Sequence, residues 1–150
     1  MVRPKMLVAA CAAVMLVAPS VGWAAAADDA AAMRSKLMEQ NGKDAKAGGQ
    51  ILKGEIPFDA AKAQAIFVGM HDVATKFGNY FPKGSITPKS EASPAIWEKP
   101  AEFKAALAKF EKDTGNAIAA KVTTKEAFGQ QFGLVTANCK SCHEAFRVKK

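Results

Sequence analysis

Apolar side chains recur at intervals of three and four along most of the chain, which is the spacing of a helix with one buried face. Four segments carry this pattern, at about residues 30–52, 59–79, 101–120 and 124–146. We find no segment with the alternating apolar and polar positions that a half-buried strand would show. The pattern therefore predicts an all-α fold, an antiparallel four-helix bundle with one long connection.

The ends of these helices are marked by residues that favour starts or stops. Asp59 and Thr124 are N-cap candidates, and Glu126 places a carboxylate in the first turn of the last helix. Gly54 followed by Pro57 predicts the end of the first helix. The sequence therefore predicts where the second and fourth helices begin and where the first helix ends.

Two stretches interrupt the helical pattern. Gly48 and Gly49 argue against helix near the end of the first segment, because glycine costs about 1 kcal/mol in a helix interior, but the pattern still extends the helix to about residue 52. Residues 81–100 are rich in Pro, Ser, Gly and Lys and predict a long loop. We expect Ile86, Ile96 and Trp97 to pin this loop to the bundle.

The beginning of the chain has the composition of a secretory signal peptide. A short basic start precedes an apolar run over residues 6–18, and small residues follow it. We expect cleavage near the end of a leader that spans 1–27, leaving 28–150 as one domain. An uncleaved membrane anchor and a lipoprotein site at Cys11 are the alternatives. The run is short for a membrane span and continues past Cys11, so cleavage fits it better.

The charge of the chain is mildly basic. It has 21 Lys and Arg against 14 Asp and Glu, a formal net charge of +7, which falls to about +5 without the leader. The lysines are scattered over all the helical segments, so a solvated surface is expected rather than nucleic-acid binding. A docking surface for acidic redox partners is the second interpretation, because charge steers encounter.

The chemistry of the chain is concentrated near its end. Cys139-Lys140-Ser141-Cys142-His143 is the Cys-x-x-Cys-His pattern that attaches haem c. Residues three apart share a helix face, so both sulfurs can form thioethers at one edge of a haem. His143 can turn beneath the ring and ligate the iron as the proximal ligand. One covalent haem per chain is therefore predicted on the C-terminal helix.

Two other chemistries use a Cys-x-x-Cys pair. A zinc site needs further soft ligands, and beyond the leader the chain offers no other cysteine and only His71 besides His143. A thiol-disulfide enzyme normally places the pair at the start of a helix, where the dipole lowers the thiol pKa. This motif lies late in a helix, so that function is the most remote alternative. We also find no nucleophile with its base and no phosphate-binding loop, and predict no enzyme and no catalytic residue.

Three stretches of the chain are similar to a known family. They are Lys-Gly-Glu-Ile-Pro-Phe-Asp at 53–59, Ser-Pro-Ala-Ile-Trp at 93–97 and Cys-Lys-Ser-Cys-His-Glu-Ala-Phe-Arg at 139–147. Together they resemble the class II cytochromes c, which include cytochrome c′, over essentially all of the mature chain. The resemblance implies a four-helix bundle in the bacterial periplasm, with a homodimer as the family expectation.

The resemblance also implies what lies on the other face of the iron. Residues 36–42, Lys-Leu-Met-Glu-Gln-Asn-Gly, resemble the low-spin branch, in which a methionine of the first helix is the sixth ligand. Met38 would then raise the reduction potential. In the high-spin branch, a bulky side chain blocks that face, and Met38 would be a flexible apolar filler. Met33, about one turn earlier, is a less favourable substitute.

Two arginines and one histidine complete the candidates. Arg147 resembles the basic residue that follows the proximal histidine in this family, and is expected to shield that face or contact a haem propionate. Arg34, four residues before Met38, is expected to approach a propionate as well. Solvated surface charges are the alternative for both arginines. His71 lies off the apolar face of its helix, so we expect a surface histidine.

Taken together, these features predict a periplasmic single-haem electron carrier with low-spin iron ligated by His143 and Met38. It would serve redox partner proteins and, once mature, would not span a membrane. A five-coordinate protein that binds nitric oxide or carbon monoxide is the alternative. The coordination number of the iron distinguishes the two.

Overall fold

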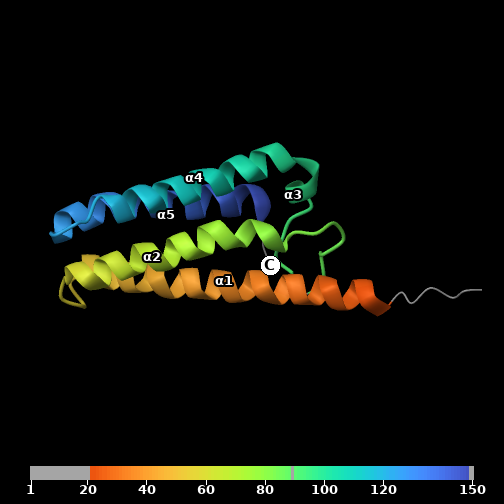
Figure 1. Ribbon diagram of the computed structural model, residues 1–150, viewed down its shortest axis with the longest axis horizontal. Helices are drawn as coiled ribbons and strands as arrows, with labels where there is room; N and C mark the ends of the chain where they lie inside the picture. The colour runs from red at the N-terminus through yellow and green to blue at the C-terminus, as the bar shows by residue number, and fades with distance from the viewer. Residues whose placement is uncertain (1–20, 89, 149–150) are drawn as a thin grey trace, which may run out of the picture.

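Four long helices lie side by side in alternating directions in the computed structural model, which describes residues 21–88 and 90–148 (Figure 1). The helical elements are α1 Val21–Lys53, α2 Ala60–Phe77, the 3-10 turn η1 Gly78–Tyr80, α3 Ala95–Glu98, α4 Pro100–Ala119 and α5 Lys125–Phe146. The predicted all-α bundle is confirmed. None of the described helices is long and apolar enough to cross a bilayer.

Helix α1 begins earlier than the pattern predicts, at Val21 rather than near Ala30. It therefore includes the last residues of the predicted leader. Residues 1–20, which hold the basic start and the apolar run of that leader, lie outside the described part of the chain.

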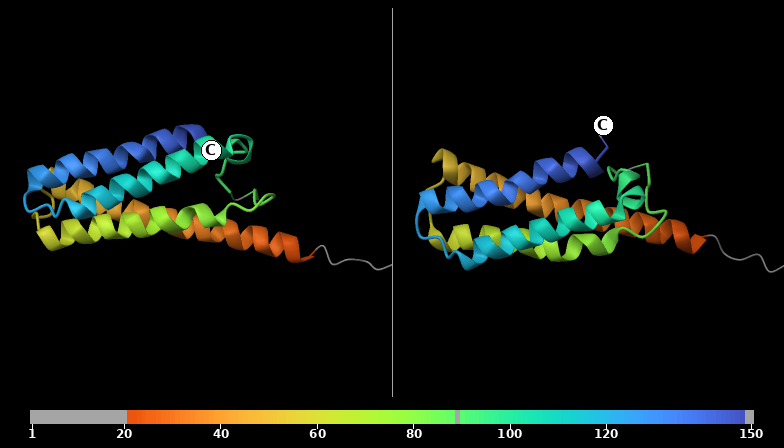
Figure 2. Two further views of the ribbon diagram at one scale, coloured as in Figure 1. Left: turned by 45° about the horizontal axis from the view of Figure 1, so that its top comes forward. Right: turned by 90° about the horizontal axis from the view of Figure 1, so that it is seen from above.

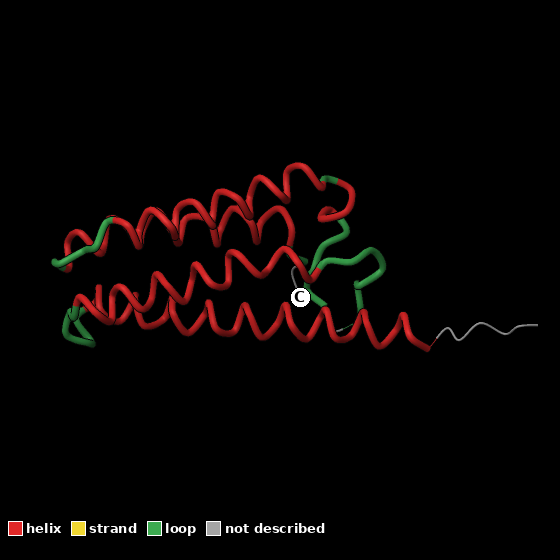
Figure 3. The backbone as a smooth tube through the Cα atoms, in the orientation of Figure 1, coloured by secondary structure: helices red, strands yellow, loops and turns green. Residues whose placement is uncertain are grey.

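Both short connections lie at one end of the bundle, and the long connection lies at the other (Figures 1 and 2). Helix α2 packs against α1 and α4, and α5 packs against α4 and α1, so the four helices enclose a common interior. The long connection is mostly loop, and the end of α5 lies close to it (Figure 3).

The N-caps of α2 and α5 are confirmed. The Asp59 carboxylate accepts a hydrogen bond from the backbone N–H of Lys62 at 2.7 Å. The Thr124 hydroxyl oxygen accepts one from the N–H of Ala127 at 3.2 Å. Each side chain satisfies a backbone donor that the first turn of a helix leaves without a partner.

Helix α1 ends where the glycine predicts. Gly54 has φ of +78°, a conformation that strains other residues. Its N–H donates to the carbonyl of Ile51 at 3.1 Å, and the next N–H, of Glu55, donates to Gln50 at 2.9 Å. This pair of bonds is the Schellman motif, which satisfies the last carbonyls of the helix.

Gly48 and Gly49 do not end α1, in agreement with the predicted helix to about residue 52. The helix continues through both to Lys53. A Cβ atom added at Gly48 would overlap the ring of Phe132 on α5, whereas one added at Gly49 would meet nothing within 4 Å. Gly48 therefore lets α1 and α5 approach closely, and that packing outweighs the low helix propensity.

The interior at the short-connection end is tightly filled, and we call it the packed half. The rings of Phe67 and Phe128 have centroids 5.3 Å apart, and those of Phe128 and Phe132 are also 5.3 Å apart. Its buried residues are Ile51, Ala63, Ile66, Phe67, Met70, Ala117, Val122, Phe128, Phe132 and Val135.

The other end is closed by a second group, which we call the aromatic cap: Phe81, Ile96, Trp97, Phe103 and Phe146. Ile96 is buried, and the Trp97 indole N–H donates to the carbonyl of Phe81 at 3.2 Å, as expected for residues that pin the long connection. The same expectation for Ile86 is wrong, because that side chain is 45% exposed. Helix α3 within this connection was not predicted.

Candidate haem-binding site

A pocket that is partly open to solvent lies among the four long helices. Along α4 and α5 its residues fall between those of the packed half and those of the aromatic cap. It is lined by Met38 and Asn41 of α1, Phe77 of α2, Ala106, Leu107 and Phe110 of α4, and Asn138, Cys139, Cys142 and His143 of α5.

The two cysteines of the motif lie in the pocket wall, late in α5. Both are half-buried free thiols. Burial raises the pKa of Cys139 and of Cys142, and the charge of Cys139 adds to the effect on Cys142. The C-terminal end of a helix does not stabilise a thiolate, which is what a thiol-disulfide enzyme requires. The environment therefore disfavours that alternative.

No three His, Cys, Asp or Glu side chains gather as a metal-ion site in residues 21–88 and 90–148. The cysteine pair thus lacks, in the described part of the chain, the further ligands that zinc requires.

His143 lies on the same wall, one residue after Cys142. Partial burial lowers the pKa of His143, and the positive charge of Arg147 adds to this, while Glu91 opposes it. The neutral imidazole is therefore favoured, and this is the form that ligates a metal.

The facing wall, on α1, carries Met38 and Asn41. They are three residues apart and therefore share one face of the helix. Asn41 is only 8% exposed, and its Oδ1 is buried without a hydrogen-bond partner. A buried amide oxygen without a donor costs about 1–3 kcal/mol, so this wall is incomplete without a group in the pocket. Thiols, imidazole and thioether fit a haem, and the unpaired oxygen fits a hydrogen-bond donor beside it such as a bound water.

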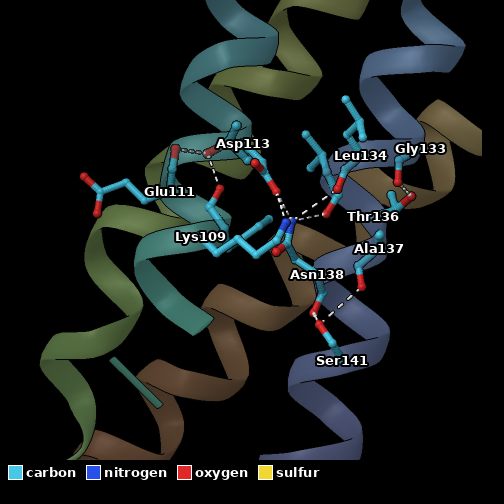
Figure 4. A network of polar contacts seen from close by, with 12 residues as sticks. Lys109, Glu111, Asp113, Gly133, Leu134, Thr136, Ala137, Asn138 and Ser141 are labelled. Carbon is cyan, nitrogen blue, oxygen red and sulfur yellow. Dashed lines mark hydrogen bonds and ion pairs between the residues drawn. The ribbon is translucent and has the colours of Figure 1, made fainter. Parts of the chain in front are cut away.

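Asn138 extends the polar part of the lining on α5. It is 5% exposed, and its Nδ2 donates to Oδ2 of Asp113 at 2.8 Å and to the carbonyls of Leu134 and Val135 at 3.2 and 3.1 Å (Figure 4). Oδ2 of Asp113 also lies 2.5 Å from Nζ of Lys109. Hydrogen bonds from Asn138 and Lys109 lower the pKa of Asp113.

Neither pocket asparagine is among the residues predicted from the sequence to form the site. Each is a polar residue at a position where the helical spacing calls for an apolar one, since Asn41 is four residues after Leu37 and Asn138 is three after Val135. That break in the pattern was the available signal.

Arg34 is engaged with the long connection. Its Nη1 donates to the carbonyl of Tyr80 at 2.7 Å and to Oγ of Ser85 at 2.8 Å. Its Nη2 donates to the carbonyl of Ser85 at 2.7 Å and to Oγ of Ser90 at 3.1 Å. The guanidinium also lies 5.0 Å from the centroid of the Phe81 ring. At 5% exposure Arg34 is not a solvated surface charge, and burial lowers its pKa.

Arg147 pairs with the long connection as well. Its Nε donates to Oε2 of Glu91 at 2.7 Å, and its Nη2 lies 2.5 Å from the same oxygen. The backbone of this region forms an isolated bridge between Ala92 and Arg147. The two arginines therefore hold the long connection against α1 and against the end of α5.

His71 is not the surface histidine that was expected. It is half-buried, and its Nδ1 lies 2.9 Å from Oγ1 of the fully buried Thr114. The contact joins α2 to α4. Periodicity within one helix could not predict it, because the two residues are 43 positions apart in the chain.

The chain is similar to known haem proteins over most of its length. Residues 29–147 match the family model described as Cytochrome C′. The chain is 38% identical to cytochrome c-556 of Agrobacterium fabrum over 117 residues, which cover 78% of this chain and 80% of that protein. It is 37% identical to cytochrome c′ of Rhodopseudomonas palustris over 138 residues, 90% of this chain and 92% of that one. A solved structure of cytochrome c′ from Rhodopseudomonas palustris matches the fold with a TM-score of 0.77 and 33% identity, covering 81% of this chain and 98% of that one. With this similarity and with the attachment motif in the pocket wall, the chain belongs to the cytochrome c′ family and binds haem c covalently.

Proposed function

We propose that the protein is a periplasmic electron carrier in which His143 and Met38 ligate the iron of its single haem. The observation that supports this most is that Met38 of α1 lines the same pocket as Cys139, Cys142 and His143 of α5. The haem supplies one-electron chemistry, with iron alternating between ferric and ferrous. The chain anchors the haem, supplies ligands from two helices and limits the access of water.

The lining of the pocket favours electron transfer over the conversion of a substrate. Apart from the attachment motif, its polar members are Asn41 and Asn138, and neither is a titratable group that could act as an acid or base. The remaining side chains are apolar, and apolar surroundings raise the reduction potential of a haem.

Arg34 and Arg147 are proposed to lie near the haem propionates. Arg34 is the stronger candidate, because it is buried and no carboxylate among the described residues pairs with it. A buried charge without a counter-charge is costly, and a propionate would supply one. Arg147 already pairs with Glu91, so its contribution would be shared.

Location and partners follow from the leader and from the family. We propose export by the segment 1–27 and docking of redox partner proteins against exposed lysines such as Lys140, whose side chain is 81% exposed. A homodimer through α1 and α2 is proposed from the family resemblance. The mass of the mature protein and its elution volume on a sizing column test these two proposals.

The optical spectrum of the ferrous protein, with and without carbon monoxide, tests the ligation. Wild-type protein is expected to show sharp low-spin bands that carbon monoxide barely changes. Met38→Ala should become high-spin and bind carbon monoxide readily. Met33→Ala, one turn earlier on α1 and outside the pocket lining, is the control and should keep the wild-type spectrum. A wild-type spectrum that is already broad and shifts readily with carbon monoxide would instead support the five-coordinate, gas-binding function.

A further inference from the structure

A line of polar side chains leads from the pocket wall to the surface, and neither haem attachment nor ligation explains it. Asn138 donates to Oδ2 of Asp113, and Lys109 contacts the same oxygen (Figure 4). Exposure rises along the line: Asn138 is buried, the Asp113 side chain is 19% exposed and the Lys109 side chain is 63% exposed. The three residues thus connect the interior of the pocket with solvent.

The negative member of the ion pair is the one nearer the pocket. Asp113 contacts Asn138 of the pocket lining, and its side chain is 19% exposed against 63% for that of Lys109. The ammonium of Lys109 is mostly in solvent, where salt and water screen its charge. The carboxylate stays ionised, since its hydrogen bonds lower the pKa of Asp113.

The amide of Asn138 is oriented by this carboxylate. Its N–H groups are used by Asp113 and by the carbonyls of Leu134 and Val135. The N–H end of the amide therefore faces Asp113 and the carbonyls of its own helix. The ionised carboxylate, bonded directly to a residue of the pocket wall, places a negative potential at that wall.

We propose that Asp113, clamped by Lys109 and acting through Asn138, is a positioning residue that lowers the reduction potential of the haem. A fixed negative potential stabilises ferric iron, which carries one more positive charge, over ferrous iron. The proposal rests on the redox cycling in the proposed function, but not on the identity of the sixth ligand.

The midpoint potential of the holoprotein, measured by spectroelectrochemical titration, tests the proposal. Asp113→Asn keeps the size of the side chain and removes its charge. We expect it to favour the ferrous state by about three- to tenfold, a rise of roughly 30 to 60 mV at 59 mV per tenfold change. Lys109→Gln leaves the carboxylate without its cation, and should shift the potential in the opposite direction.

The opposite signs separate electrostatics from a structural role, because a loosened contact between α4 and α5 would move both variants the same way. Asp72→Asn is the control: Asp72 and Lys76 also form an i,i+4 ion pair, in the reverse order, on α2, both side chains are 54% exposed, and neither lines the pocket. We expect less than a twofold change for it.

Two results would overturn the proposal: a shift in Asp113→Asn no larger than that in Asp72→Asn, or shifts of the same sign in the Asp113 and Lys109 variants. If Asp113→Asn does not fold, the sign of the Lys109→Gln shift decides. The absorption spectra of the same samples report ligation, so they show whether Met38 is a ligand. The potentials of the variants can be compared with that of wild type in either case.

Discussion

The packed half and the pocket are built by the same four helices, yet the packed half is filled by side chains and the pocket is open. On α5, Phe128 and Phe132 fill the interior of the packed half. The same stripe continues as Asn138, Cys139 and Cys142, which line the pocket. The comparison teaches that one helical stripe can encode both a protein core and a cofactor site. Side-chain size and polarity, not periodicity, separate them.

The two regions also differ in whether their side chains leave space or polar groups without a partner. In the packed half, Gly48 removes a side chain altogether, so that Phe132 can lie against α1. In the pocket, Asn41 keeps a buried oxygen without a partner, whereas the amide of Asn138 is anchored by Asp113. The packed half is therefore complete in the polypeptide alone. The pocket is completed by its haem.

The largest expected effect is at the centre of the packed half. Phe128→Ala should lower the free energy of unfolding of the holoprotein by about 3–5 kcal/mol, because it leaves a cavity in a fully buried aromatic cluster. Denaturant titration followed by circular dichroism measures this. Leu134→Ala, also on α5 but 60% exposed, should change it by less than about 0.5 kcal/mol. Equal effects would mean that the packed half is not tightly packed.

A smaller effect, with a change of sign, is expected at the paired glycines. Gly48→Ala should destabilise the protein by about 1–3 kcal/mol, since its methyl group overlaps the Phe132 ring. Gly49→Ala has open space and should stabilise it by about 0.5–1 kcal/mol through helix propensity. The same titration distinguishes them. If both variants were more stable than wild type, the approach of α1 to α5 would not depend on Gly48.

The smallest effect is a pH dependence at the edge of the pocket. Hydrogen bonds from Asn138 and Lys109 hold the pKa of Asp113 below its ordinary value in the folded state. Its contribution to stability is therefore present above the unfolded pKa of about 3.9 and is lost as the pH falls through the lower folded value. The difference in thermal midpoint between wild type and Asp113→Asn should be largest near neutral pH and vanish in acid.

Asp44 offers the opposite sign as an internal comparison. Burial raises the pKa of Asp44. Its ionised form therefore destabilises the fold, and Asp44→Asn should gain stability near neutral pH, with the gain vanishing in acid. Parallel behaviour of the two variants would show that acid acts on the bundle as a whole and not through these carboxylates.

Features that depend on neighbouring residues could be predicted from the sequence. The caps at Asp59 and Thr124 each join groups three residues apart, and the glycine at position 54 ends its helix with local hydrogen bonds. The haem-attachment motif is equally local, because its spacing alone puts both cysteines on one face. Ligation by Met38 stays a prediction, although the fold brings Met38 and the motif to one pocket.

Errors arose where a residue's role depends on a distant partner. Gly48 was interpreted through helix propensity, but the ring of Phe132 decides its role. His71 was placed on the surface, but Thr114 of another helix contacts it. Arg34 was given only the choice between propionate and solvent, yet it also binds the long connection.

The sequence by itself determined the four long helices, the ends marked by Gly54, Asp59 and Thr124, and the covalent haem chemistry, because each follows from residues close to one another in the chain. Only the tertiary structure decided which part of the interior is filled, which asparagines enter the pocket and how Asp113 reaches it. Asp113 and Asn138 are 25 residues apart in the chain, and their contact exists only because α4 and α5 pack together.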